Sequence, residues 1–500
     1  MTTATPVTPV DAEPGNVADR LEGAVPPLPD GFTDRLHATG AAVFTDDSAR
    51  AEAGRDWWPI AIGWAAAGAV PQRPAVVVRP TSTTQVAAVL ELCHETVVAV
   101  TPMAGRSGVC GGSIPVHGGV ALDLTGLDGV VGVDEDSLTA TVRAGTFGPD
   151  LEAALGQIGS GYTVGHWPQS MDLSTVGGWL ACRGAGQYST RYGKIEDMVV
   201  GLEVVLADGR VVHTEGHAPR AATGPNLTQL FVGSEGTLGV ITEATFRIHP
   251  LPPSQERRAF GFETFDSGLD ACRRILRRGA TPAVLRLYDE VESGRNFEQP
   301  DTNVLIVLDE ADDALVRATV DIVDQECEQA HSLDVELVER WLGHRNDVSA
   351  LAPLWRAGIV VDTAEVCGPW SALPALFAGV VASLRSLEGT LAASAHQSHA
   401  YPDGACLYFT FAGRGPDGDA EWRERYYRAA WDTVTDITLA HHCAISHHHG
   451  IGLNRSRFMH RALGTGFDVL AALKKSLDPV GILNPGKLGL PSPFGSSPWS

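Results

Sequence analysis

The 500-residue sequence lacks the features of a membrane-spanning or secreted protein. No apolar run reaches the roughly 18 residues that cross a bilayer, and residues 1–29 lack the charged-then-apolar pattern of a signal peptide. Basic residues are scarce, with 37 Lys and Arg against 60 Asp and Glu and a net charge of −23. Because nucleic-acid phosphates require a basic surface, we expect no nucleic-acid partner. These absences favour a cytoplasmic protein without a transmembrane segment.

Cysteine is sparse and unpaired along the sequence. The eight cysteines are scattered and form no Cys-x-x-Cys pair. In a long chain without a signal peptide, this pattern predicts reduced thiols and neither a disulfide framework nor a zinc site.

The first half of the chain alternates β-branched runs with glycine turns. The runs at 75–79, 97–101, 120–124 and 138–142 predict strands by their length and side-chain branching. Helical spacing over 84–93 places a β-α-β unit between the first two strands. A short helix is expected over 150–155, and residues 202–212 predict two strands around an Asp-Gly turn.

The rhythm changes after the Pro-rich stretch 250–253, where helical patterns over 266–279 and 313–339 alternate with strands such as 304–308. A chain of this length exceeds one hydrophobic core, so we predict two domains, the second of α+β type. The predicted division is an N-terminal tail and lead-in (1–69), a first domain (70–253), a second domain (254–442), a C-terminal segment (443–490) and a tail (491–500).

Three glycine-rich stretches, 102–112, 168–183 and 233–242, occur in the first domain. Glycine lets successive backbone N–H groups point inward at an anion, as a diphosphate requires. The first stretch alone is equally compatible with an ordinary turn, and it lacks the G-x-G-x-x-G spacing and following helix of a Rossmann fingerprint. Three such turns in one domain together favour a large nucleotide cofactor.

These stretches, in this order and spacing, resemble the FAD-binding domain of the vanillyl-alcohol-oxidase and p-cresol-methylhydroxylase family. The runs 174–201, 219–250, 404–409, 446–452 and 484–487 are similar to the alkylglycerone-phosphate-synthase (alkyldihydroxyacetonephosphate-synthase) branch. The resemblance covers roughly 70–490. It implies an α+β fold with a two-part FAD-binding domain of the PCMH type, formed by 70–253 and the returning segment 443–490. The intervening residues 254–442 would form a cap or substrate domain.

The resemblance also implies which segments contact FAD. The matching residues are Pro102, Met103, Ala104, Gly105, Arg106, Ser107, Gly108, Gln169, Ser170, Met171, Asp172, Leu173, Ser174, Thr175, Cys182, Arg183, Gly184, Ala185, Glu235, Gly236, Thr237, Leu238, Gly239, Val240 and Ile241. The diphosphate loop reads Ala-Gly-Arg-Ser-Gly where the family usually has Gly-Gly-Gly-Thr-Ser. It holds no histidine for a covalent flavin bond, and Cys110 is better explained as a small buried residue than as a thioether. We therefore expect non-covalent FAD.

Five catalytic candidates follow from the same resemblance: Tyr408, Arg286, His447, His448 and His449. By residue pattern alone, Tyr408 fits a packed strand tyrosine and Arg286 a strand residue whose charge reaches solvent or a surface acid. Three consecutive histidines are harder to explain by packing. We expect them to point in different directions and to serve proton transfer or substrate binding, with no metal site.

The leading functional prediction is an FAD-dependent oxidoreductase that transfers a hydride from a small hydroxylated substrate to flavin N5, with Tyr408 or a histidine as base. The first alternative is an alkylglycerone-phosphate-synthase-like, redox-neutral exchange of an acyl for an alkyl group through a flavin N5 adduct. A non-catalytic flavin-binding protein is the second. The family usually has an arginine where this chain has Leu351, and Arg356 is out of register. An arginine there would bind a phosphate or carboxylate, so its absence weakens the expectation of the family's phosphorylated substrate. A homodimer is the one oligomeric state that we consider for this chain.

Overall fold

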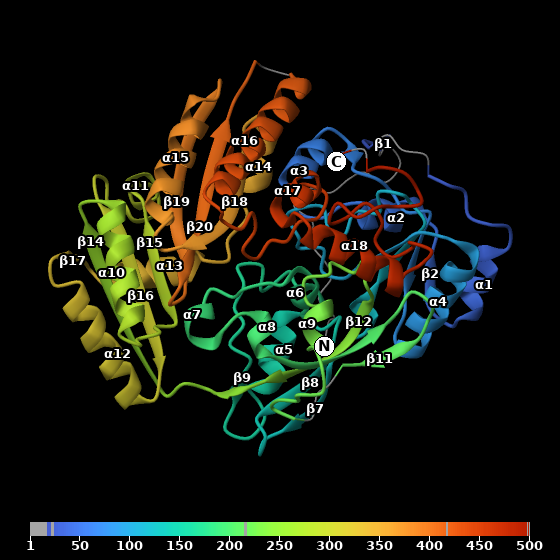
Figure 1. Cartoon of the computed structure of the whole chain (residues 1–500), viewed down its shortest axis with the longest axis horizontal. Coiled ribbons are helices and arrows are strands. Elements are labelled where there is room, and N and C mark those ends of the chain that lie inside the picture. Colours follow the sequence, from blue (N-terminus) through green and yellow to red (C-terminus); the bar gives the residue numbers. More distant parts are fainter. Residues whose placement is uncertain (1–17, 22–24, 215–217, 417–418, 498, 500) are drawn as a thin grey trace.

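The computed structural model describes residues 18–21, 25–214, 218–416, 419–497 and 499. Part of the predicted N-terminal tail (1–17 and 22–24) and of the C-terminal tail (498 and 500) lies outside them. A seven-stranded sheet with its helices lies on one side of Figure 1, and the smaller N-terminal sheets lie on the other. The C-terminal segment, in red, lies against the N-terminal side.

The N-terminal part contains two main sheets, with strand orders β2-β4-β6-β5 and β11-β10-β12-β8-β7. In the first, β4, β6 and β5 run parallel, and α4 connects β4 to β5 as the predicted β-α-β unit. The elements of the whole N-terminal part are β1 (Ala18–Asp19), α1 (Phe32–Ala38), β2 (Ala42–Phe44), α2 (Asp47–Ala53), α3 (Pro59–Ala66), β3 (Ala69–Val70), β4 (Val76–Arg79), α4 (Thr83–Thr96), β5 (Val100–Met103), β6 (Val120–Asp123), η2 (Leu124–Gly126), β7 (Val130–Asp134), β8 (Thr139–Arg143), α5 (Gly148–Leu155), β9 (Tyr162–Thr163), α6 (Val176–Cys182), α7 (Ser189–Tyr192), α8 (Ile195–Met198), β10 (Val199–Val205), β11 (Val211–His213), α9 (Thr228–Phe231), β12 (Val240–Arg247) and β13 (His249–Pro250).

The middle part forms the seven-stranded sheet, in the order β17-β14-β16-β15-β19-β20-β18. Its strands pair antiparallel throughout. Its elements are β14 (Ser254–Phe262), α10 (Phe265–Arg277), β15 (Val284–Tyr288), α11 (Glu290–Phe297), β16 (Asn303–Ala311), α12 (Asp313–Glu326), β17 (His331–Ser332), α13 (Glu336–His344), α14 (Leu351–Arg356), β18 (Val360–Pro369), α15 (Leu373–Ser386), β19 (Thr390–Ala400), β20 (Gly404–Gly413) and α16 (Ala420–Ala440).

One predicted helical stretch is wrong. The pattern over 313–339 predicts continuous helix, whereas α12 ends at Glu326 and α13 begins at Glu336. Between them β17 pairs with Phe260 and Gly261 of β14 at the sheet edge, and the Asp334 carboxylate accepts a hydrogen bond from the Glu336 N–H. Edge pairing and a new helix start therefore outweigh the local helical pattern.

The C-terminal segment contains η3 (Ser456–Phe458), α17 (Met459–Leu463) and α18 (Gly466–Leu477). It returns to the N-terminal part, where Leu483 bridges Val100 of β5. Buried Lys474 of α18 donates hydrogen bonds to the carbonyls of Thr237 and Leu483, at 2.9 and 2.7 Å. This segment fixes the orientation of the loop that precedes it, which carries the three histidines.

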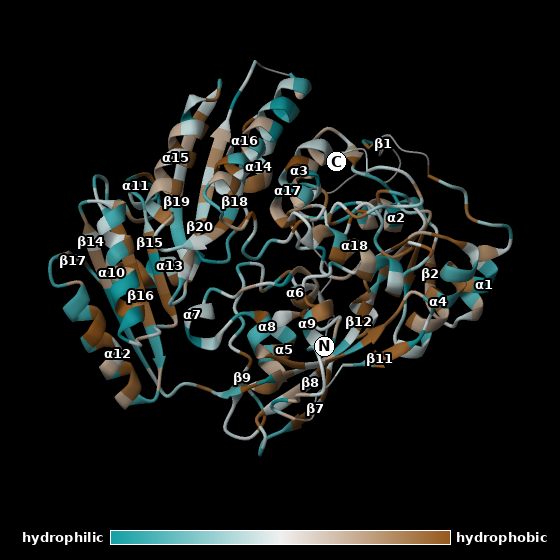
Figure 2. Ribbon diagram, viewed as in Figure 1, coloured by the Kyte–Doolittle hydropathy of each residue, from teal (hydrophilic) through white to brown (hydrophobic). Residues whose placement is uncertain are grey.

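The hydrophobic cores match this arrangement, and Figure 2 shows apolar residues in brown along the strands of the sheets. One core lies within the five-stranded sheet and its helices, and another beneath β4, β5 and β6. The largest core belongs to the seven-stranded sheet but includes α3 from the N-terminal part. A Cβ added at Gly63 of α3 would lie 2.4 Å from the Trp355 ring, so glycine is required for this close packing.

Candidate active site

Four adjacent strands of the large sheet place polar side chains in one row. Glu365 on β18 is paired with Tyr408 on β20, Tyr408 with His396 on β19, and His396 with Tyr288 on β15. Directly opposed residues project from the same face of a sheet. The His396 ring stacks between the two tyrosines, with centroids 4.9 Å from Tyr408 and 5.0 Å from Tyr288.

A β-bulge adds His399 to this face. In a regular strand, residues 396 and 399 would project from opposite faces. The register between β19 and β20 shifts between Gln397 and His399, and one extra residue reverses the alternation. His399 consequently stacks on His447, with ring centroids 4.8 Å apart.

Buried Glu365 organises the histidine loop. Its Oε1 accepts hydrogen bonds from the backbone N–H groups of His447, His448 and His449 at 3.2, 3.2 and 2.8 Å. Its carboxylate also forms a two-point ion pair with Arg455, and both side chains are fully buried. Burial alone would raise the pKa of Glu365, but the charge of Arg455 and contact with His449 outweigh it and hold that pKa well below its ordinary value.

His449 connects Glu365 to Tyr408. Its Nδ1 lies 3.1 Å from Glu365 Oε2, an ion-pair distance rather than an aligned hydrogen bond, and its Nε2 lies 3.1 Å from the Tyr408 hydroxyl. Thr363 donates to that hydroxyl at 3.2 Å, so the Tyr408 O–H is left to donate to His449 Nε2. Burial raises the pKa of Tyr408 well above its ordinary value, which keeps the hydroxyl protonated at rest.

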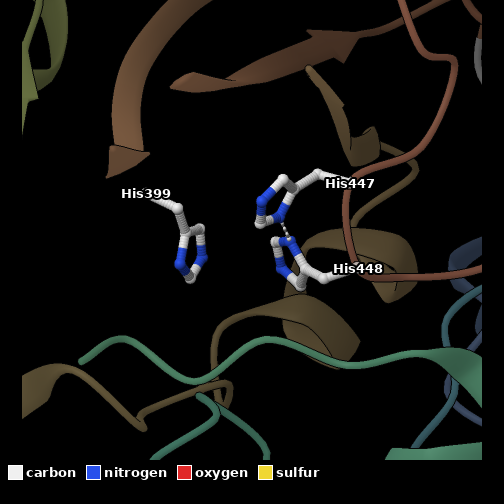
Figure 3. Close-up of side chains that lie close together, drawn as sticks. All are labelled: His399, His447 and His448. Atoms are coloured by element: carbon white, nitrogen blue, oxygen red, sulfur yellow. Dashed lines mark hydrogen bonds between the residues drawn. The ribbon is translucent and has the colours of Figure 1, made fainter. Parts of the chain in front are cut away.

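His399, His447 and His448 form a separate group, in which the three imidazole rings lie close together (Figure 3). Their Nδ1 atoms are 2.9 Å apart, so the prediction that consecutive histidines diverge fails for this pair and holds only for His449. Burial lowers the pKa of His447 to about 4 and lowers those of His448 and His399 well below the ordinary value. All three imidazoles are therefore neutral near pH 7.

Arg286 lies on the same face as Tyr408 but reaches neither solvent nor an acid. It is 9% exposed, and its Nη2 donates to His396 Nε2 at 2.8 Å while its Nε donates to the Tyr288 hydroxyl at 3.1 Å. Arginine only donates, so His396 is protonated on Nδ1, which faces Glu292 at 2.7 Å. The default prediction from the strand pattern, a charge that reaches solvent, is wrong at this position.

A second guanidinium lies nearby. Arg345, in the loop after α13, contacts the rings of Trp167, Tyr188 and Trp341, and Arg286 contacts the same Trp341 ring at 5.4 Å. Over the chain that the structure describes, neither arginine has an ion pair with a carboxylate. Uncompensated, partly desolvated guanidinium groups favour an anionic ligand.

The segments predicted to contact FAD converge in space. A Cβ added at Gly105 would lie 2.2 Å from the Leu173 carbonyl, and one at Gly236 would lie 3.0 Å from the Pro102 ring. The Glu235 N–H donates to the Ala181 carbonyl at 2.8 Å. Segments 102–108, 169–175 and 235–241 thus lie against one another, and segment 182–185 is joined to them through its preceding residue, Ala181.

Two further observations fit these segments to a bound dinucleotide. Arg106, Arg183 and Glu235 adopt left-handed backbone, with φ of 55, 60 and 48°, and strain of this kind gathers at ligand sites. Among the described residues, Arg106 Nη1 and Thr175 Oγ1 are also buried without a protein partner. Arg106 Nη2 pairs with Glu52 at 3.5 Å, and the remaining Nη1 in the loop 102–108 suits a diphosphate oxygen.

The glycines of the histidine loop approach protein rather than open space. The carboxylate of Glu235 accepts from the N–H groups of Ile451 and Gly452 at 2.5 and 2.8 Å. A Cβ at Gly450 would lie 2.5 Å from Glu235, and one at Gly452 would lie 2.1 Å from the Cys110 carbonyl. These glycines join the histidine loop to a predicted FAD segment.

The structure shows the surroundings of Cys110 and of Leu351, which bear on two departures of the sequence from the family pattern. Cys110 is 3% exposed, and burial raises the pKa of its thiol well above the ordinary value, so the thiolate needed for a thioether is disfavoured. Leu351 packs against the main core at the start of α14, and Arg356 is exposed at the end of that helix. Neither position places a guanidinium beside Tyr408.

Comparison with known proteins agrees with this geometry. Residues 74–215 match the family described as FAD binding domain, and residues 251–488 match FAD linked oxidases, C-terminal domain. Over 433 residues the chain is 32% identical to the uncharacterized FAD-linked oxidoreductase YgcU of Escherichia coli (strain K12), covering 83% of this chain and 89% of YgcU. The chain belongs to the FAD-linked oxidase family. It is an enzyme, and its cofactor is FAD.

The predicted branch and fold are confirmed. The chain is 30% identical over 461 residues to the alkyldihydroxyacetonephosphate synthase of Dictyostelium discoideum, covering 84% of this chain and 74% of that one. A solved alkyldihydroxyacetonephosphate synthase has a TM-score of 0.77 at 26% identity, covering 97% of this chain and 90% of that one. A solved p-cresol methylhydroxylase, at 18% identity and a TM-score of 0.75, covers 93% and 98% and has the same fold. No helix among the described residues has the length and apolarity to span a membrane.

Sequence reasoning missed several residues of the site. His396 and His399 became visible only through strand register, and Glu292 of α11 only through its contact with His396. Arg455 became visible only through the fold of the C-terminal segment. The sequence His-Gln-Ser-His in a strand next to the Tyr408 strand was an available signal, because histidine is only intermediate in its tendency to be buried.

Proposed function

We propose that this FAD-linked oxidoreductase oxidises a small hydroxylated substrate, with Tyr408 and His449 removing the hydroxyl proton. The observation that carries the proposal is the chain of contacts from Glu365 through His449 to the Tyr408 hydroxyl. FAD, when bound, would supply the acceptor for the hydride that leaves the carbon bearing the substrate hydroxyl. The hydride carries both electrons of the oxidation, and the proton leaves from the hydroxyl oxygen.

The proton path follows from the order of contacts. Because burial disfavours the Tyr408 phenolate, Tyr408 alone is a poor base. It passes its proton to His449 Nε2 as it receives the proton of the substrate hydroxyl. The Glu365 carboxylate, 3.1 Å from His449 Nδ1, stabilises the imidazolium that results. Arg455 holds Glu365 ionised throughout.

Arg286 and Arg345 set the expected substrate class. Their guanidinium groups lie against Trp341 without a carboxylate partner among the described residues. Arg286 is held by His396, whose ring stacks on Tyr408, so an anion bound by Arg286 would lie close to the reacting hydroxyl. We therefore expect a substrate with a carboxylate or phosphate group.

A second candidate is a redox-neutral exchange of an acyl for an alkyl group, as the alkyldihydroxyacetonephosphate synthases among the relatives suggest. Leu351, at the position where that branch usually has an arginine, counts against it. The same Tyr408 and histidine groups would serve either reaction.

One experiment distinguishes them. Purified holoenzyme is mixed anaerobically with a panel of alcohols and hydroxy acids while flavin absorbance is followed. Bleaching supports oxidation, and recovery on admitting air identifies an oxidase. No bleaching across the panel, together with ether formation from an acylated phosphate and a fatty alcohol, would replace the oxidase proposal with the synthase.

A further inference from the structure

We propose that His399, His447 and His448 form a binding site for one divalent transition-metal cation beside Tyr408. One ring nitrogen from each residue lies within 4.8 Å of those of the other two, and Figure 3 shows the three rings converging from β19 and the histidine loop. The expectation of no metal rested on the three consecutive histidines alone. The bulge in β19 supplies the third imidazole.

The spacing suits a cation with modest adjustment. Tetrahedral Zn²⁺ with Zn–N bonds of about 2.0–2.1 Å places its ligand nitrogens about 3.3 Å apart. His447 Nδ1 and His448 Nδ1 are 2.9 Å apart, close to that value. At this distance two nitrogen lone pairs repel unless a proton or a cation lies between them.

Outer hydrogen bonds orient two of the imidazoles for ligation. The Ser189 hydroxyl bonds His399 Nδ1 at 2.8 Å, and the Tyr401 hydroxyl bonds His447 Nε2 at 3.0 Å. The two hydroxyls also bond each other at 3.1 Å. These contacts leave His399 Nε2 and His447 Nδ1 for a cation, and metal-binding histidines commonly have their second nitrogen bonded in this way.

The position of the group separates it from the proton path. His449 points to Tyr408 and Glu365, while His448 stacks near Tyr408 at 6.0 Å between ring centroids. A three-nitrogen site leaves at least one coordination position open. If the proposed oxidation is correct, that position would bind an oxygen of the substrate; this role, unlike the site itself, rests on the proposed function.

The test counts zinc and does not require turnover. Holoenzyme is stripped with EDTA, desalted, incubated with one equivalent of Zn²⁺ and desalted again, and zinc and FAD are then measured per chain. We expect about one zinc per chain for wild type, with imidazole nitrogens as the nearest atoms in zinc-edge X-ray absorption. His399→Ala and His448→Ala should retain at least tenfold less zinc with FAD unchanged.

Two controls sharpen the result. The double variant His441→Ala/His442→Ala removes two nearby histidines outside the group and should retain zinc as wild type does. His399→Gln replaces the imidazole with another polar side chain and serves where alanine prevents folding. Wild type that retains no more zinc than His399→Gln, or variants that retain it fully, would overturn the site. Normal zinc retention without flavin bleaching would overturn only the proposed oxidation.

Discussion

Replacing Glu365 with Gln tests whether one buried carboxylate holds the site together. Glu365 and Arg455 are both fully buried and paired at two points. Glutamine is nearly isosteric but leaves the Arg455 charge buried without its partner. Breaking a buried pair in this way typically costs about 3–5 kcal/mol. Glutamine also turns an amide N–H₂ toward groups that now donate to the carboxylate, which adds to the loss.

Urea unfolding of the holoenzyme, followed by tryptophan fluorescence, measures the effect. We expect the free energy of unfolding of Glu365→Gln to fall by about 3–5 kcal/mol at pH 7. The double variant Glu365→Gln/Arg455→Met removes both charges and should be more stable than Glu365→Gln alone. A single variant within about 1 kcal/mol of wild type, or a double variant whose loss equals the sum of the single losses, would refute the reasoning.

Three further outcomes are expected. Tyr408→Phe should keep its fold and FAD but lose roughly 10²–10⁴-fold in turnover, whereas Tyr426→Phe, whose hydroxyl bonds Thr390, should keep normal turnover; equal rates would assign the base elsewhere. Because burial lowers the pKa of His447 from 6.5 to about 4, the unfolded chain binds more protons between these values. Stability should therefore fall as the pH is lowered from 6.5 to about 4, by at most about 1.4 kcal/mol per pH unit, and less steeply in His447→Asn. Acid precipitation should release FAD into the supernatant, and flavin retained on the pellet but not on that of Cys110→Ala would establish a thioether.

Much of the fold was predictable because it depends on local patterns. The strands and the helix around 76–103 follow from β-branched runs and helical spacing, and the Ser82 side chain caps that helix by accepting from the Gln85 N–H. The Asp-Gly turn between β10 and β11 likewise sets an antiparallel pair. The break between α12 and α13 was missed, because it depends on pairing of β17 with a strand about 70 residues earlier.

The same contrast between local patterns and long-range pairing applies to the residues of the candidate site. Tyr408 and the three consecutive histidines could be found from sequence, since their motif is local. Their relation to one another could not, because it depends on which strands are neighbours: Glu365 lies beside Tyr408 only through the β18–β20 register. The domain boundaries and the roles of the FAD segments stay predictions.

His399 shows most clearly why register matters for function. Counting along β19 assigns residues 396 and 399 to opposite faces, so no argument from alternation would place both imidazoles beside Tyr408. The bulge after Gln397 reverses that assignment, and Ser189 from the N-terminal part then fixes the His399 ring at 2.8 Å. One irregular residue therefore decides whether the histidine loop meets the His399 imidazole. If the bulge were straightened, His396 would still hold Arg286, but His447 and His448 would have no third imidazole to share a cation.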